Sequence, residues 1–323
     1  MEPIKSFACK NPDLGIRLQS SSGGVFTLLA IYFIEKGGVV FGARFDNQWN
    51  VIHDFTASIS GLQYFRGSKY VQSCLGDSYK KCKEFLKQGR QVLFSGTPCQ
   101  IAGLKNYLGK EHENLMTIDT ICHAVPSPKI WNKFLDETCA GLYINRKDIE
   151  KIDFRDKSFG WENYSFTIDY AQKGVLQQLK NQFVHNPYGK SFLQHLSIRP
   201  SCTQCPAKEG KSHSDITLGD FWGIDEIFPE FNDDKGVGLL LINSEKGQRI
   251  VSEIELELVE VDLKSAIFYN PSWQKSAWTN SDSIPFFFFI NHGGSISKAS
   301  NSSFVYRIIR KFFRIFNGVI DEQ

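Results

Sequence analysis

Four cysteines have a spacing that could bring their thiolates to one inorganic centre. Cys202 and Cys205 form a C-x-x-C pair in the proline-bounded loop RPSCTQCPA, and both of its sulfurs can face one metal. Cys99 and Cys122 each follow an apolar run. On spacing alone the pair could also be half of a zinc site, a redox dithiol or a chance occurrence, and Cys99 or Cys122 taken singly could be a buried apolar residue. The remaining cysteines have no partner spacing and are assigned no chemistry: Cys9, Cys74, Cys82 and Cys139.

A strand–helix–strand pattern positions Cys99 and Cys122. The apolar run Gln91–Ser95 ends at the turn Gly96-Thr97-Pro98, a helix-like segment begins at Cys99, and a second apolar run covers Leu115–Ile121. The strands of such a βαβ unit are parallel and commonly neighbours. Both cysteines therefore lie at carboxyl ends of strands, where α/β sheets collect ligands. Cys99 also opens a helix, whose partial positive charge favours a thiolate.

The other segments predict an α/β fold with a mixed sheet, the βαβ unit near its middle, a β-rich second half and a C-terminal amphipathic helix. Beyond Gly141, short apolar runs alternate with turn residues, which is typical of strands. Before it, helices and strands are predicted at Gly24–Lys36, Val39–Phe45, Val51–Ala57, Asp77–Gly89 and from Pro128.

Several strings, in order from about Ser20 to about Asn243, resemble the beta subunit family of coenzyme F-420 hydrogenases and dehydrogenases. Motifs that match in this order are far more specific than any one of them. They are SSSGGVFTLLA (Ser20–Ala30), FRGSKYVQS (Phe65–Ser73), LFSGTPCQIAGLK (Leu93–Lys105), TICHAVPSPKIW (Thr120–Trp131), DFRDKSFGW (Asp153–Trp161), LSIRPSCTQC (Leu196–Cys205) and SDITLGDFWGI (Ser214–Ile224).

The resemblance implies a flavoprotein that holds FAD beside a 4Fe-4S cluster and exchanges electrons with a deazaflavin or another two-electron carrier. Some bacterial relatives are linked with polysaccharide synthesis. Carried over by motif, the cluster ligands are Cys99, Cys122, Cys202 and Cys205. The flavin contacts predicted in the matched motifs are Ser21, Ser22, Gly23, Gly24, Ser68, Lys69, Tyr70, Ser95, Gly96, Thr97, Lys157 and Asp220.

The same resemblance suggests an organisation in three parts. Residues 1–110 would be the flavin side of the family core, 111–270 would carry the cluster and further flavin contacts, and 271–323 would be a C-terminal tail. A boundary near residue 110 cuts the βαβ unit, so the first two parts are expected to fold together.

Two features depart from the family's pattern. Members commonly carry a ferredoxin-like segment before the serine–glycine motif, whereas only Met1–Gln19, with a single Cys9, precede that motif here. Such a shortened member would receive electrons from a separate ferredoxin or another electron-transfer protein. Ala124 stands where the family usually has glycine, and its methyl group could crowd a backbone that approaches the flavin.

Several charged residues in these motifs have both a functional and a structural interpretation. Lys69 and Lys157 could place positive charge beside the flavin and stabilise its anionic reduced form, or they could be solvated. His123, the one candidate for a catalytic residue, could relay a proton or donate to a cluster sulfur, or it could be structural. Arg155 and Asp156 are adjacent and could form a surface ion pair.

Glycine and aromatic residues have similar alternatives. Ser21–Gly24 could bind a phosphate through free backbone amides, or it could be only a helix start. Trp161 and Trp222 offer faces that a flavin ring could stack on, although tryptophan in a β-rich region is usually core. Asp220 follows an apolar strand and could contact the flavin or its ribose.

Composition favours a soluble enzyme. The 323 residues are 41% hydrophobic and 22% charged, and 37 basic against 35 acidic residues leave a net charge of +2, which does not indicate nucleic-acid binding. The longest apolar stretch, Phe26–Ile34, is too short to span a bilayer, and the amino terminus has no apolar signal region. Cysteines without short even spacing favour a reducing compartment, so a cytoplasmic location is expected.

The C-terminal end has a different character. Phe304–Ile320 places apolar residues at helical spacing with basic residues on the other side, which predicts a basic amphipathic helix. Such a helix can lie on a membrane surface or dock a protein partner, although packing on its own domain is the commoner outcome.

The function expected from these observations is an oxidoreductase that moves electrons between a ferredoxin-type donor and a two-electron acceptor through a 4Fe-4S cluster and FAD. A first alternative is a zinc-binding structural or interaction module. A second is a transferase with Cys99 as nucleophile and His123 as base.

Overall fold

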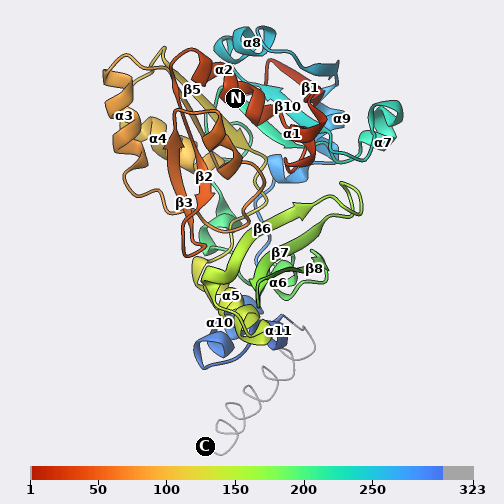
Figure 1. Ribbon diagram of the computed structural model, residues 1–323. Helices are drawn as coiled ribbons and strands as arrows, with labels where there is room; N and C mark the ends of the chain where they lie inside the picture. Colours follow the sequence, from red (N-terminus) through yellow and green to blue (C-terminus); the bar gives the residue numbers. More distant parts are fainter. Residues whose placement is uncertain (1, 301–323) are drawn as a thin grey trace, which may run out of the picture.

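An eight-stranded mixed sheet forms the larger part of the molecule in the computed structural model, which describes residues 2–300 (Figure 1). Its strands lie in the order β11-β1-β10-β9-β5-β4-β2-β3. The central strands β2, β4, β5 and β9 are parallel, and the strands on both sides of them are antiparallel to their neighbours. The bounds are β1 Lys5–Lys10, β2 Val39–Phe45, β3 Val51–Thr56, β4 Val92–Gly96, β5 Leu115–Thr120, β9 Ile216–Asp220, β10 Gly238–Ile242 and β11 Glu257–Glu260.

Helices cover both faces of this sheet. Leu93 of β4 packs in a cluster with residues of α2, whereas the next residue, Phe94, packs in a cluster with residues of α3 and α4 on the opposite face. Successive side chains of a strand point to opposite faces, so a strand buried on both sides has the continuous apolar run seen in the sequence. The helices around the large sheet are α1 Leu14–Leu18, α2 Val25–Glu35, α3 Ser78–Lys87, α4 Pro98–Leu108, α7 Ile224–Ile227, α8 Glu245–Ser252 and α9 Leu263–Phe268.

A three-stranded antiparallel sheet, β6-β7-β8, lies below the large sheet in Figure 1 and carries its own core. Its fully buried Phe154 and Phe166 pack with Trp131 and Tyr188 from the helices beside it. The elements of this part are β6 Ile149–Asp156, β7 Ser165–Gln172, β8 Val175–Gln182, α5 Pro128–Leu142, α6 Pro187–Leu193, α10 Ser283–Asn291 and α11 Ile296–Ala299.

The predicted fold class is confirmed. The strand–helix–strand unit is β4-α4-β5, its strands are neighbours, and the chain beyond residue 141 contributes six strands, β6 to β11. The helix predicted over Phe304–Ile320 lies outside the described residues. Within the described part of the chain, no helix is both long enough and apolar enough to cross a membrane.

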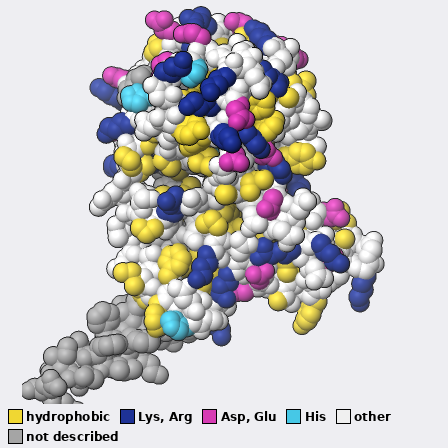
Figure 2. Space-filling view, turned by 90° about the vertical axis from the view of Figure 1, so that its left-hand side faces the viewer, with side chains coloured by type: hydrophobic (Ala, Val, Ile, Leu, Met, Phe, Trp, Pro, Cys, Tyr) yellow, Lys and Arg dark blue, Asp and Glu magenta, His cyan; other side chains and the backbone are white. Residues whose placement is uncertain are grey.

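The surface carries both signs of charge. Figure 2 shows Lys and Arg side chains mixed with Asp and Glu over the part of the molecule that holds the large sheet. This mixture agrees with a sequence whose net charge is +2.

Candidate functional site

Cys99 and Cys122 follow the carboxyl ends of two neighbouring parallel strands. The register of β4 and β5 pairs Gly96 with Asp119, and each cysteine comes three residues after its member of that pair. Pro98 begins α4 and Thr97 caps it, so Cys99 lies in the first helical turn with its Sγ 3.2 Å from the Thr97 hydroxyl. The placement predicted for these two cysteines is therefore present in the fold.

The loop with Cys202 and Cys205 reaches the same place through backbone pairing. Pro126 and Ile198 form an antiparallel bridge, the Arg199 amide donates to the Val125 carbonyl (3.0 Å), and a short 3-10 helix, Pro200–Gln204, then carries Cys202. Burial raises the pKa of the Cys202 thiol, and a hydrogen bond with the backbone of Val125 limits the rise. The C-x-x-C loop is thus held against the chain that follows Cys122.

All four thiols lie within electrostatic range of one another. Burial raises the pKa of Cys122 to about 12; Lys208 lowers it, and Cys99, Cys202 and Cys205 raise it further. All eight cysteines are free, Cys9, Cys82 and Cys139 being buried elsewhere and Cys74 exposed. Among the described residues, no three His, Cys, Asp or Glu side chains are close enough to hold a single metal ion.

A segment near residue 275 closes over the cysteine loops, and sequence reasoning missed it. The Ala277 amide donates to the Cys202 carbonyl (3.2 Å), and the Cys205 amide donates to the Ser276 hydroxyl (3.0 Å). The buried Lys208 ammonium donates to the carbonyls of Cys122 (2.5 Å) and Ser272 (2.6 Å). Nothing in the cysteine spacing points to Ser272–Trp278, which we call the clamp segment.

His123 is engaged by two partners, one of which, His195, sequence reasoning also missed. The Nε2 atoms of the two rings are 2.7 Å apart, Nδ1 of His195 is 2.9 Å from the Trp278 carbonyl, and Nδ1 of His123 is 3.2 Å from the Ser272 hydroxyl. A carbonyl only accepts, so His195 carries its proton on Nδ1 and its Nε2 is an acceptor. His123 therefore donates from Nε2, and its Nδ1 accepts from the Ser272 hydroxyl. Burial, His195 and Lys208 together lower the pKa of His123 to about 4, so the ring is neutral at pH 7.

A buried carboxylate lies beside the cysteine centre. Asp119 of β5 is 2% exposed, accepts hydrogen bonds from Ser212 and Thr217 (both 2.5 Å), and lines a cavity of about 10 Å³ together with Cys122. Burial raises the pKa of Asp119 to about 6, and the hydroxyl donors limit the rise. The folded protein therefore binds a proton more tightly here than the unfolded chain does.

We expect the stability contributed by Asp119 to fall as the pH rises. Between about pH 4 and pH 6 the folded state holds more protons than the unfolded state, so the free energy of unfolding decreases across that window, by roughly 3 kcal/mol in total. Urea unfolding of the wild type and Asp119→Asn at several pH values measures the effect, because the variant lacks this contribution. Parallel pH profiles for the two proteins would contradict the assignment.

The residues predicted to contact a flavin fall into two groups, and the larger one is linked by hydrogen bonds. The Ser68 amide donates to the Ser21 hydroxyl (2.6 Å), which joins the loop before α2 to the Phe65–Ser73 motif. The Lys157 ammonium donates to the carbonyls of Arg17 (3.0 Å), Ser22 (3.0 Å) and Lys235 (2.8 Å). The structure therefore brings together segments that are about 140 residues apart in the chain.

Asp220 belongs to the same group through a buried ion pair. Arg155 is 3% exposed and donates to both carboxylate oxygens of Asp220 (2.9 and 3.1 Å) and to the Tyr70 hydroxyl (3.1 Å). The interpretation of Arg155 and Asp156 as a surface pair is wrong, because β6 directs Arg155 inward, while Asp156 pairs with Lys180 (3.1 Å). A buried arginine needs a buried acid, and only the fold shows which one.

Positive charge accumulates at this junction between the two sheets. Arg17 pairs with Asp233, Arg155 pairs with Asp220, and the Nε atom of each arginine is buried without a hydrogen-bond partner among the described residues. Burial, and then repulsion by Arg155 and Arg17, lower the pKa of Lys157 to about 7. Arg17, Arg155 and Lys157 thus lie close together at this junction, with Asp233, Asp220 and Asp153 beside them.

Other predicted contacts have structural roles. Trp161 is fully buried and stacks on Trp222 at 5.1 Å, so its face is occupied by protein. A Cβ on Gly23 would come within 2.4 Å of the Cys9 carbonyl, which explains this glycine by packing. Gly24 caps α2 in the left-handed region, with φ of 79°, and as a glycine it offers no side chain to the first-turn amides. Ala124, at the position of the family glycine, packs into the core around α5.

The second, smaller group is Ser95, Gly96 and Thr97 at the end of β4. The Ser95 hydroxyl donates to the Phe41 carbonyl (2.8 Å), and Thr97 forms a capping box with Gln100. Lys69, whose pKa burial lowers to about 8, donates to the carbonyls of Arg66 and Gly67 (both 3.0 Å). The Gln72 amide donates to the Pro126 carbonyl (3.1 Å), so the Phe65–Ser73 motif runs between the larger flavin group and the chain after Cys122.

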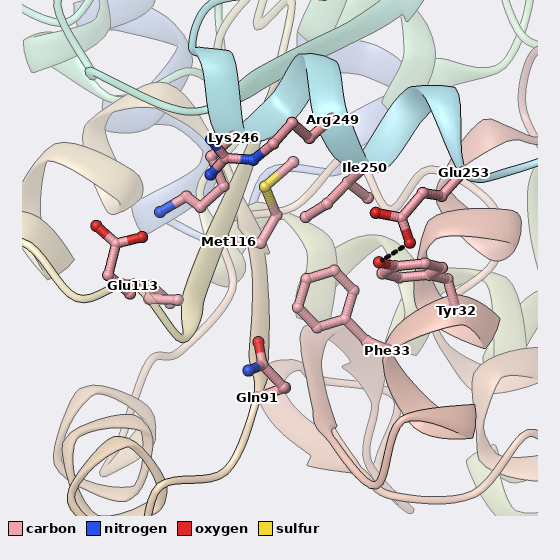
Figure 3. Close-up of a pocket in the computed structure, with 10 residues that line it drawn as sticks. Tyr32, Phe33, Gln91, Glu113, Met116, Lys246, Arg249, Ile250 and Glu253 are labelled. Atoms are coloured by element: carbon pink, nitrogen blue, oxygen red, sulfur yellow. Dashed lines mark hydrogen bonds between the residues drawn. The ribbon is translucent and has the colours of Figure 1, made fainter.

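A hollow of about 190 Å³ lies away from the cysteines (Figure 3). Tyr32 and Phe33 of α2, Arg249 of α8, Glu253 just after α8, and Gln91 just before β4 line it. It opens at the amino ends of the parallel strands, opposite the edge that carries the cysteines. Because Glu253 already accepts from Tyr32 (2.7 Å) and Lys36 (3.0 Å), we assign this hollow no chemistry.

Fold and site together define an α/β protein with free cysteines at the carboxyl ends of parallel strands. The chain belongs to the family described as the C terminus of the beta subunit of coenzyme F420 hydrogenase/dehydrogenase, which matches residues 89–264. Its function is therefore related to oxidoreductase chemistry. No curated protein shows a significant match to the chain.

A solved structure shows the same fold. It is a chain of the F420-reducing [NiFe] hydrogenase complex from Methanosarcina barkeri, with 18% sequence identity and a TM-score of 0.53. The match covers 90% of this chain and 94% of that chain.

Proposed function

We propose that this protein is an iron–sulfur flavoprotein oxidoreductase that holds a 4Fe-4S cluster on Cys99, Cys122, Cys202 and Cys205 and binds FAD at the junction of the two sheets. The observation that carries the proposal is the gathering of four free cysteines, from three separate segments, at one edge of the large sheet. Four cysteine thiolates are the usual ligand set of such a cluster.

Four cysteine thiolates could also hold one zinc ion as a structural site. The family match, to the beta subunit of hydrogenases and dehydrogenases, supports the iron–sulfur cluster over zinc. Iron and zinc analysis of the purified protein separates the two.

The contacts of His123 weigh against the transferase alternative. A general base for Cys99 needs a ring nitrogen within hydrogen-bond reach of the thiol. Both nitrogens of His123 instead have partners, His195 and Ser272, and the Cys99 sulfur lies beside the Thr97 hydroxyl. We therefore keep His123 as a residue that supports the cysteine loop rather than as a base.

The protein groups around the cysteines can hold and tune a cluster. The Val125 amide points at the Cys202 sulfur, and hydrogen bonds to ligand sulfurs raise the reduction potential of a cluster. Lys208 adds positive charge beside Cys122, which favours its thiolate. When bound, the cluster supplies one-electron transfer and FAD supplies the conversion between one- and two-electron steps.

The junction of the two sheets has features that fit a dinucleotide. Arg17, Arg155 and Lys157 bring positive charge to it, and the Nε atoms of the two arginines are buried without partners among the described residues. An anionic pyrophosphate would balance that charge. The first turn of α2, which has no side-chain cap, adds amides that favour phosphate. Lys69 and Ser68 lie on the loop that connects this junction to the cysteine edge.

Electrons are proposed to arrive from a separate ferredoxin or another electron-transfer protein and to leave to a deazaflavin-like or other two-electron acceptor. Phe304–Ile320, proposed to contact a membrane surface or a protein, lies outside the described residues.

Anaerobic purification tests the proposal directly. We expect a coloured protein that contains about four iron and four sulfide per chain, together with FAD released on denaturation. An absorbance spectrum with iron, sulfide, zinc and flavin analysis gives the answer. A colourless protein that contains zinc, or one without any metal, would overturn the cluster, and absence of flavin from a protein that contains iron would overturn the FAD site alone.

A further inference from the structure

Exposed apolar side chains surround the clamp segment at the cysteine edge. Trp278 is 56% exposed, Ile284 at the start of α10 is 80% exposed, and Leu193 at the end of α6 is 38% exposed. Two hydrogen bonds hold their segments together: the Asn280 side chain donates to the Gln194 carbonyl (2.7 Å), and the Ser283 hydroxyl donates to the Leu196 carbonyl (2.9 Å). We call Leu193, Trp278 and Ile284 the apolar rim.

The apolar rim connects to the cysteines through direct contacts. The indole of Trp278 lies on the ring of His195, with centroids 4.7 Å apart, and His195 bonds to His123, the neighbour of Cys122. Ala277, just before Trp278, bonds to the Cys202 carbonyl. The exposed indole is therefore linked to the Cys122 segment through two side chains, His195 and His123. It is linked to Cys202 through the backbone hydrogen bond of the preceding residue, Ala277.

The segments around the rim carry an excess of positive charge. The stretches 96–105, 120–131, 190–208 and 272–284 hold the four cysteines and the clamp segment. Arg199, Lys275 and Lys129 are exposed on them. Their basic residues are Lys105, Lys129, Lys190, Arg199, Lys208 and Lys275, of which Lys208 is buried. Their one acidic residue is Asp282, and the exposed Glu209, whose amide donates to the Trp273 carbonyl (3.0 Å), follows directly after them. This excess is local, because the whole chain has a net charge of only +2.

We propose that the apolar rim, with Arg199 and Lys275 beside it, is the docking surface for a small acidic electron-transfer protein that delivers electrons to the cysteine centre. This inference rests on the proposed cluster and adds where its partner binds. A small apolar contact ringed by charge is the usual form of a short-lived redox encounter, because charge speeds the approach and a small buried area allows release. One electron leaves the reduced partner, which is oxidised, and enters the centre, which is reduced, without bond or proton transfer.

Binding to an acidic bacterial ferredoxin tests the surface. The anaerobically purified full chain and its Trp278→Ala variant are titrated with the oxidised ferredoxin in a calorimeter at low salt. We expect the Kd of Trp278→Ala to rise at least about tenfold, as for a central aromatic contact residue. Ile284→Gln, which changes the rim without touching the histidines, is expected to raise the Kd in the same direction. Leu176→Gln, at a 67% exposed position on β8, is the control and is expected to bind like the wild type.

Reduction kinetics add a readout that separates docking from damage to the centre. Reduced ferredoxin is expected to reduce Trp278→Ala at least about tenfold more slowly than the wild type at subsaturating concentration. Dithionite, a small reductant that needs no docking, is expected to reduce both proteins equally. Slower reduction by both reductants would show that Trp278→Ala damages the centre. In that case the binding and reduction of Ile284→Gln decide whether the apolar rim is the docking surface.

Charge reversal tests the nature of the partner. The double variant Arg199→Glu and Lys275→Glu is expected to bind the ferredoxin more weakly at low salt, with a difference from the wild type that shrinks at high salt.

An iron-containing wild type that does not bind the ferredoxin, or rim variants that bind it unchanged, would overturn the docking surface and leave the proposed function intact. A wild-type dimer in sedimentation that Ile284→Gln dissociates would assign this face to a second copy and also overturn it. A protein without iron would overturn the proposed function itself.

Discussion

Cys122→Ser is expected to yield a protein with little or no bound iron and no visible absorbance band from the cluster. A serine oxygen is a poor replacement for a thiolate on iron, and the other three cysteines all raise the pKa of the Cys122 thiol. Anaerobic purification followed by iron and sulfide analysis measures the loss. Cys99→Ser, Cys202→Ser and Cys205→Ser are expected to lower the iron content in the same way.

Cys74→Ser provides a matched control for this series. Cys74 is an exposed free cysteine outside the set, so its loss is expected to leave iron, sulfide and absorbance unchanged. Wild-type iron content in any one of the four serine variants would remove that cysteine from the ligand set. Equal losses in all five variants would point to a general effect of thiol removal.

Arg155→Met is expected to lower the free energy of unfolding by about 3 to 5 kcal/mol, because it leaves the Asp220 carboxylate without its buried partner. The Tyr70 hydroxyl also loses its contact with the guanidinium, while Trp161 still donates to Asp220 through Nε1 (3.1 Å). Urea unfolding followed by circular dichroism measures the change, on protein purified without the centre so that cofactor loss does not contribute.

Lys5→Met is the matched control for that loss. Lys5 pairs with Glu260 across the edge strands at 3.8 Å, with 40% and 65% of the two side chains exposed, so its removal should cost less than about 1 kcal/mol. An Arg155→Met variant that unfolds like Lys5→Met would show that the junction of the two sheets tolerates an unpaired acid. The energetic importance given to the pair would then be wrong.

Local patterns were sufficient to predict the elements that carry Cys99 and Cys122. The apolar runs Gln91–Ser95 and Leu115–Ile121 predicted β4 and β5, the turn at Gly96-Thr97-Pro98 predicted the start of α4, and the short connections implied parallel neighbours. These features depend on residues close together in sequence. The family resemblance then connected this unit to the distant C-x-x-C pair, which spacing alone could not do.

Contacts across long stretches of chain could not be predicted in the same way. The clamp segment reaches the cysteine loops from residues 272–278, and its serines and alanine have no chemistry that marks them as part of a site. Arg155 looked like a surface residue beside Asp156, because only the inward direction of β6 and the position of Asp220 show that it is buried. The approach of His195 to His123, 72 residues apart, likewise depends on how α6 is placed.

The clamp segment also determines when, during synthesis, the cysteine loops become covered. The ribosome releases the chain from its amino end, so the last of the four cysteines, Cys205, emerges well before Ser276 and Ala277, which close over its loop. A nascent chain that has released Cys205 but not yet Ser276 and Ala277 therefore exposes all four thiols without their cover. Under the proposed function, iron and sulfide would be inserted best after residues 272–278 have left the ribosome, because this segment can then shield the cluster from solvent.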